Sequence, residues 1–531
     1  MKLDPKLVCN IENQSNFQSS YHGTKARGSY NTMRFVMKLR DDIVQAMNSE
    51  ENSYEKIQAY STYLHENIHW WQHVGSNFGF IYSLSYPAIT MTSIVDLKEL
   101  LKKKITVKPL IKFYDSNKEV VKELVMLTYK FYCIKHAKNF AFDNKNFNEI
   151  LKDRKTFVSL GSCYHVLWQI SILSLTTVDP KYKIIPKIEK WDEEFQRLLE
   201  NQVEGFDIIN KKIRVSSMGI RAIYEGQAIF NQLQYLAFSL DDELSFQDCE
   251  RAGMLYGVYY EAFNFFIETT TFKKPDGFLN SVVGLFLLVC DLAINPTNGF
   301  PFDIYDYENF IVKNDPGMRF TKMCYFINEN KSEFENEIDK YSKDEYNNIS
   351  KKLSDYLGCI SPNECGKLIN NWISEPEIKD LIKDEVDSKL VNNLFHIKLF
   401  FSKYLQFQND KYEHPNIFCW IGYHMTPANK DVAYAAKIFN KHRVLFQVAP
   451  DGNIKPSLFE HLDEANTVEA FNFFYRNNIL DDLILKWICE EGEFQFDYNW
   501  LTPFTDDEQI NRLKEYFERI FDFSIDNIKP I

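Results

Sequence analysis

The chain is poor in the two residues that make tight turns. Glycine contributes 19 and proline 17 of its 531 residues, each below about 4% where roughly 7% and 5% are usual. A β-sandwich, a propeller or a collagen-like chain needs many such residues, so these architectures are disfavoured. Helices need few turns, and we therefore expect a mainly α fold with a small β component (α+β).

Acidic residues outnumber basic residues, and cysteines are few for a disulfide-bonded chain. The chain has 61 Lys and Arg residues against 74 Asp and Glu residues, a formal net charge of −13. It therefore offers no basic footprint for nucleic acid, and we expect no such partner. Its 10 cysteines include no C-x-x-C pair and are too sparse for a disulfide framework. Reduced thiols in a cytoplasmic protein fit this usage best.

No apolar run is long enough to suggest a membrane segment. The most apolar stretch covers residues 278–294 and contains Asn280, Ser281 and Asp291. A bilayer needs about 20 predominantly apolar residues, so we expect a buried core helix here and no membrane partner. The first residues lack the apolar core of a signal peptide, which again favours the cytoplasm.

Two common catalytic signatures are missing. The chain has no glycine-rich phosphate loop of the Walker type, so an ATPase is disfavoured. It also lacks a G-x-S-x-G elbow, which argues against an α/β-type serine hydrolase. Any chemistry must come from other residues.

Helical patterns recur along most of the chain. The densest cluster of turn-forming residues lies at 295–301 and suggests a boundary between residues 1–300 and a helix-rich C-terminal region, 301–531. Residues 33–39 alternate as a strand does. Residues 443–456 have the pattern of a short hairpin with Pro450-Asp451-Gly452-Asn453 at its turn.

Residues 65–69 form the motif H-E-x-x-H. They lie in a stretch with apolar residues at helical spacing, for which Gly75 is the expected end. Positions i and i+4 are about 40° apart around a helix, so His65 and His69 project from the same face. Two such imidazoles can hold one Zn²⁺. Glu66 lies beside this metal position and can act as general base on a zinc-bound water.

A zinc site of this kind needs a third protein ligand. Glu225 is the best candidate, because apolar residues surround it in another predicted helix, and Gly226 would let that helix approach the H-E-x-x-H helix closely. Rival ligands are His73, His165 and Glu261.

These residues resemble a known family. His65-Glu66-Asn67-Ile68-His69 resembles the active-site helix of the zincin metallopeptidases, and Glu225-Gly226-Gln227-Ala228 is similar to the segment that carries the third ligand in gluzincins. The resemblance implies that His65, His69 and Glu225 bind zinc and that Glu66 is the general base. The intervening 155 residues are more than most gluzincins have.

The expected function is zinc-dependent hydrolysis of peptide bonds. The substrate would be intracellular peptides or one specific protein, as for a toxin or defence protease. Gluzincins often stabilise the oxyanion with Tyr or His, and Tyr224 and His424 are candidates here. Two alternatives stay open: a di-iron helical protein, which would need a second E-x-x-H, and a helical metal-binding or scaffold protein without peptidase activity.

Overall fold

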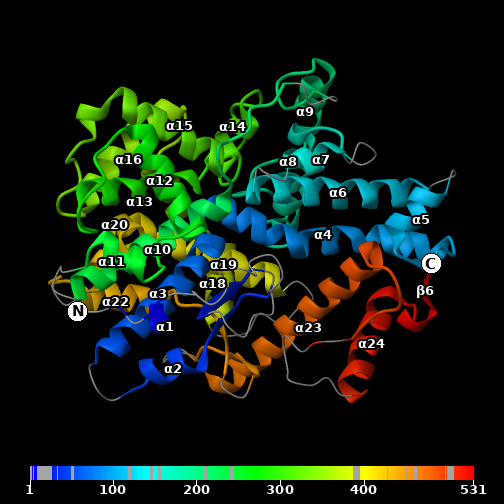
Figure 1. The fold of residues 1–531 in the computed structure, drawn as a ribbon. Coiled ribbons are helices and arrows are strands. Elements are labelled where there is room, and N and C mark those ends of the chain that lie inside the picture. The colour runs from blue at the N-terminus through cyan, green and yellow to red at the C-terminus, as the bar shows by residue number, and fades with distance from the viewer. Residues whose placement is uncertain are drawn as a thin grey trace.

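Helices dominate the structure, a computed structural model shown in Figure 1. This confirms the expected mainly α fold with a small β component. The structure describes residues 3, 5–8, 27–32, 34–49, 53–117, 121–143, 147–152, 157–207, 212–239, 244–386, 395–426, 429–449, 452–458, 463–496, 498 and 507–531.

The helices and strands have the following bounds. The helices are α1 (Pro5–Val8), α2 (Asp41–Met47), α3 (Tyr54–Gly75), α4 (Asn77–Lys102), α5 (Leu110–Ser116), α6 (Lys122–Phe142), α7 (Phe147–Lys152), α8 (Leu160–Leu175), α9 (Trp191–Glu200), α10 (Ile220–Ser239), α11 (Phe246–Arg251), α12 (Val258–Thr270), α13 (Ser281–Ala293), α14 (Phe310–Asn314), α15 (Pro316–Glu329), α16 (Lys343–Leu357), α17 (Pro362–Ile373), α18 (Pro376–Val386), α19 (Phe395–Glu413), α20 (Pro415–Cys419), α21 (Ile421–His424), α22 (Val432–Lys441), α23 (Glu464–Cys489) and α24 (Asp507–Phe521). Two short 3₁₀ helices are η3 (Lys331–Glu333) and η4 (Ile525–Asn527). The strands are β1 (Gly28–Asn31), β2 (Val36–Leu39), β3 (Val107–Lys108), β4 (Phe446–Val448), β5 (Ile454–Pro456) and β6 (Lys529–Pro530).

Helix α3 carries the H-E-x-x-H motif and is a core element. It begins after Ser53, whose hydroxyl accepts a hydrogen bond from the backbone N–H of Lys56 at 3.3 Å and so satisfies one free donor of the first turn. From Gln58 onwards nearly every side chain is buried. A helix that is buried on all sides is held by packing around its whole circumference. The motif therefore lies on a rigid support.

Gly75 ends α3 as expected, but not through a left-handed backbone conformation. A Cβ atom on Gly75 would lie 2.3 Å from the ring of Phe407 in α19. That ring is itself held between Trp71 and Phe418, at centroid distances of 5.6 and 4.6 Å. Glycine is therefore required here by the close approach of α19 to α3.

Helix α4 was not predicted from the sequence. Pro87 lies inside it, and a proline removes one helical hydrogen bond and usually ends or kinks a helix. By length and composition α4 is the one described helix able to cross a membrane, but 67% of its apolar window is buried within the protein. The most apolar stretch, 278–294, contains α13, which is a buried core helix as expected.

A small sheet joins strands β1 and β2, near the N-terminus, to strands β4 and β5 in the C-terminal part of the chain. Its strand order is β1-β2-β4-β5, with antiparallel pairs β1–β2 and β4–β5 and a parallel pair β2–β4 that places Val36 opposite Phe446. The pair β4–β5 confirms the hairpin expected within 443–456, and β2 lies in the stretch where a strand was expected. Met33, Pro450 and Asp451 lie outside the described residues.

One large group of buried hydrophobic side chains extends from Leu3 to Tyr475, and so includes residues on both sides of position 300. A second group joins the far ends of α4 and α6 to α23 and α24, near the C-terminus (Figure 1). The division into regions 1–300 and 301–531 stays a prediction, because a shared core does not show whether either part folds alone.

The packing of α19 on α3 can be tested at Gly75. Gly75→Ala should lower the free energy of unfolding by about 1–3 kcal/mol, because the added methyl group overpacks the contact with Phe407. Gly277→Ala is the control, since a Cβ atom there meets nothing within 4 Å, and it should change stability by less than about 0.5 kcal/mol. Urea unfolding of both variants measures the difference. Equal midpoints would contradict the close contact.

Candidate metal centre

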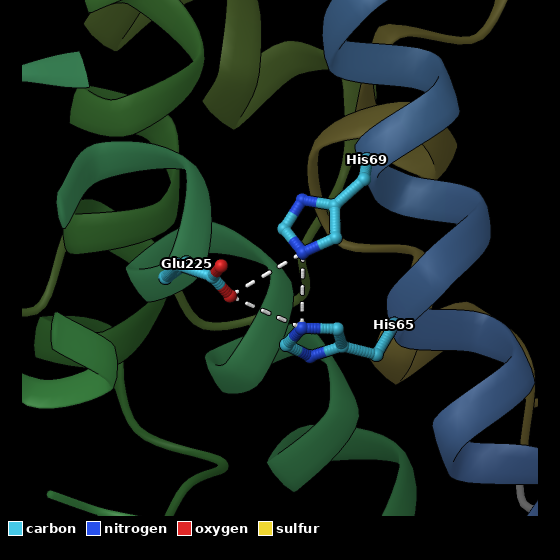
Figure 2. Close-up of side chains that lie close together, drawn as sticks. All are labelled: His65, His69 and Glu225. Carbon is cyan, nitrogen blue, oxygen red and sulfur yellow. Dashed lines mark hydrogen bonds and ion pairs between the residues drawn. The ribbon is translucent and has the colours of Figure 1, made fainter. Parts of the chain in front are cut away.

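Three side chains from two helices meet at one point (Figure 2). His65 and His69 project from the same face of α3, and Glu225 reaches toward them from α10. The Nε2 atoms of the two histidines are 3.1 Å apart, and Oε2 of Glu225 is 3.3 Å from each of them. The three residues expected as ligands are therefore brought together. In the part of the chain that the structure describes, no other group of three His, Cys, Asp or Glu residues is so arranged.

The spacing of these three atoms fits a zinc ion. Ligand atoms at about 2.0–2.1 Å from a tetrahedral zinc lie about 3.3 Å from one another, close to the observed 3.1–3.3 Å. Oε2 of Glu225 is also buried, and a buried carboxylate without a positive partner is costly. A cation between the three atoms would remove that cost, so both the donor set and its spacing fit zinc.

Gln72 fixes the orientation of His69 and was missed in the sequence. Its Oε1 lies 2.8 Å from Nδ1 of His69. An amide oxygen can only accept, so Nδ1 carries the hydrogen and Nε2 is left with a free lone pair toward the common point. The Nε2 of Gln72 in turn donates to the backbone oxygen of Tyr224 and to Oε1 of Gln227, both at 2.9 Å. The available signal was its position three residues after His69, on the same helix face.

Glu66 lies beside the three ligand atoms without joining them. Only 6% of the residue is exposed, and its side chain packs directly on Gly28 in β1. A Cβ atom on Gly28 would lie 2.6 Å from both Cγ and Oε1 of Glu66. Gly28 therefore leaves the room that the carboxylate occupies, which the sequence did not reveal.

The buried position of the site shifts the pKa values of its groups. Burial lowers the pKa of His65 to about 4 and raises the pKa of Glu66 to about 7. Burial also opposes protonation of His69, but the adjacent Glu225 carboxylate outweighs it and raises the pKa of His69 to about 9. Burial favours the neutral form of Glu225, but the charge on His69 outweighs it and holds the pKa of that carboxyl well below its usual range. Without a metal, protonated His69 and ionised Glu225 therefore form an ion pair. A metal that binds here must displace the proton on His69.

The rival third ligands lie elsewhere. His73 is one turn beyond His69, and its ring stacks on Tyr30 at a centroid distance of 5.7 Å. His165 stacks on Phe195 at 4.2 Å. Glu261 lies in the first turn of α12 and lines a cavity. None of the three belongs to the group formed by the two motif histidines and the α10 carboxylate.

Both residues considered for the oxyanion already have partners. The hydroxyl of Tyr224 donates to the backbone oxygen of Gln72 at 3.3 Å. The ring nitrogens of His424 lie 3.1 Å from the backbone oxygen of Tyr341 and 2.8 Å from the side-chain amide of Asn429. Neither is placed as a free donor at the metal centre.

Gly226 acts on a different contact from the one expected. A Cβ atom there would lie 3.2 Å from Ala262 in α12 and from Phe286 in α13. The glycine therefore faces away from α3 and lets α10 approach the two helices behind it.

Comparison with known proteins finds no matching family model, no related curated protein and no similar solved structure at a significant level. The resemblance to the zincins therefore stays a prediction from residues 65–69 and 225–228 alone. Function has to be inferred from the geometry of this centre.

The orienting role of Gln72 predicts a loss of metal affinity. Gln72→Leu removes the acceptor for His69, and outer-shell partners of this kind are usually worth about 10–100-fold in affinity. Competition with a chromogenic zinc chelator would measure the change.

Gln232→Leu is the matched control for this experiment. Gln232 is also a buried amide between α10 and α3, but it donates to Ser61 at 2.9 Å rather than to a ligand. Its replacement should leave zinc affinity nearly unchanged. An equal loss in both variants would mean that helix packing, not the orientation of His69, sets the affinity.

Proposed function

We propose that the protein is a zinc-dependent peptidase with its active centre at His65, His69 and Glu225. The observation that carries the proposal is where the two histidines and Glu66 of α3 lie relative to Glu225. The two histidines meet Glu225 at one point, whereas Glu66 is buried, interacts electrostatically with His69 and Glu225, and lies outside the ligand group. Three protein ligands leave one tetrahedral position open for water or substrate, and an adjacent carboxylate can serve as base.

Each residue around the proposed zinc position then has a defined task. Zinc bound here would lower the pKa of a water molecule and polarise the carbonyl under attack. Glu66 accepts the proton that the attacking water loses and delivers it to the leaving nitrogen. Gln72 keeps the hydrogen of His69 on Nδ1, and Gly28 leaves space for the Glu66 carboxylate.

The edge of the small sheet supports a peptide as substrate. β1 pairs with β2 on one side, and no other strand among the described residues pairs with it. Gly28 of β1 lies against Glu66, so β1 passes the proposed base. An extended peptide could add to it as a further strand, held by main-chain hydrogen bonds.

The proposed place of action is the cytoplasm. The nine cysteines among the described residues are all free thiols, and seven of them are buried. Free thiols persist in reducing compartments. The substrate there would be intracellular peptides or one specific protein, as for a toxin or defence protease.

The ligand set predicts how metal content responds to substitution. Protein purified without chelators should carry about one zinc per chain. His65→Ala and His69→Ala should abolish zinc retention, because the two ligands that remain are too few to hold the ion. Glu225→Gln should weaken it, whereas Glu261→Gln, outside the ligand group, should not. Elemental analysis of all five proteins is the measurement, and full zinc in both histidine variants would refute the site.

The role of Glu66 separates catalysis from metal binding. Glu66→Gln is nearly isosteric but cannot accept a proton, so peptide hydrolysis should fall by about 10²–10⁴-fold while zinc is retained. Glu55→Gln is the control, since it changes an exposed carboxylate at the start of the same helix and should not affect the rate.

Zinc and peptidase rate are to be measured on the same samples. A Glu66→Gln variant that keeps both its zinc and its full rate would show that Glu66 is not the base. Zinc in the wild type without hydrolysis of any peptide pool would favour either the alternative, a helical metal-binding or scaffold protein, or a protease restricted to one protein target or awaiting a trigger.

A further inference from the structure

A cavity of about 260 Å³ lies beside the metal centre. It is bounded by the C-terminal end of α6, the first turn of α10 and the N-terminal end of α12. Its volume corresponds to roughly eight or nine water molecules at about 30 Å³ each. It is therefore large enough to receive one long side chain.

Two residues connect this cavity to the proposed ligands. Tyr259 lines the cavity, and its ring lies edge-on to that of His65 at a centroid distance of 6.0 Å. Ala222 lines it as well, one helical turn before Glu225 on α10. When the scissile bond of a peptide lies at the metal centre, the side chain of the peptide residue next to that bond could therefore reach this cavity.

The lining combines aromatic rings with an excess of negative charge. Phe142, Tyr256 and Tyr259 supply the rings, and Asp143 and Glu261 supply carboxylates. Among the lining residues that the structure describes, Arg221 is the one cation, and its guanidinium lies over the ring of Phe142, 5.8 Å from the centroid. Whatever ion pairs these residues make, one negative charge remains in excess within the lining.

We propose that this cavity receives a basic side chain, lysine or arginine, of the peptide substrate next to the bond that is cleaved. The inference rests on the proposed peptidase function and names its substrate class. The net negative charge of the described lining residues would favour the cationic end group, and the rings would contact its aliphatic stem and charge. An acidic side chain would meet that same net negative charge and be rejected.

Peptide binding tests the preference directly. The probes are labelled, blocked alanine octapeptides whose two central residues are both lysine, both glutamine or both glutamate. Their affinities for the full-length, zinc-loaded Glu66→Gln protein are measured by fluorescence anisotropy. We expect the lysine peptide to bind about tenfold more tightly than the glutamine peptide, the size of one charge-assisted contact, and the glutamate peptide to bind most weakly.

Substitutions of charged lining residues in the Glu66→Gln protein should change the lysine-over-glutamine affinity ratio in opposite directions. Glu261→Gln should reduce the lysine-over-glutamine ratio about fivefold to tenfold, and Arg221→Gln should increase it. Glu268→Gln is the matched control, because Glu268 is an exposed carboxylate further along α12 that does not line the cavity. It should leave the ratio unchanged.

The outcomes separate this inference from the proposed function. Equal binding of all three peptides, or tightest binding of the glutamate peptide, would overturn the basic preference. Cleavage of all three by the wild-type protein with equal kcat/KM would also overturn it, while supporting the peptidase function. Lysine preference in binding without cleavage of any of the three peptides would support the cavity's role and count against short peptides as substrates of the centre.

Discussion

The close approach of α10 to α3 is the contact on which the proposed function depends. It places Oε2 of Glu225 3.3 Å from the Nε2 atoms of both His65 and His69, and 155 residues separate this carboxylate from the motif in the chain. Gly226 acts on the other side of α10, where it lets α12 and α13 pack closely against that helix. A shift of one ångström between the helices would spoil the ligand spacing.

This interface is unusually polar for a protein core. Gln72, Gln227 and Gln232 are buried within it, and all three donate or accept a hydrogen bond across the helix pair. Buried amides are costly when unpaired and rigid when paired. The same network that holds the helices therefore orients the His69 ring. Burying the Glu66 carboxylate costs further free energy. The carboxylate fits in this position because Gly28 has no side chain.

Several elements could be read from the sequence because their signals are local. Helix α3 follows from apolar residues at helical spacing, and the hairpin near residues 443–456 follows from its turn formers. Helix α4 escaped prediction because Pro87 lies inside it and burial on most faces leaves no one-sided pattern. β1 escaped because four residues, including a glycine, carry little strand propensity.

The sequence by itself determined that His65 and His69 share a helix face with Glu66 beside them, since helical geometry follows directly from residue spacing. It also singled out Glu225 by its surroundings. Only the tertiary structure decided that Glu225, rather than His73, His165 or Glu261, meets the histidines, and that Gln72, Gly28 and the cavity at α12 surround them. The physical reason is that these contacts join segments far apart in the chain. Their distances depend on how whole helices pack, which no local pattern encodes.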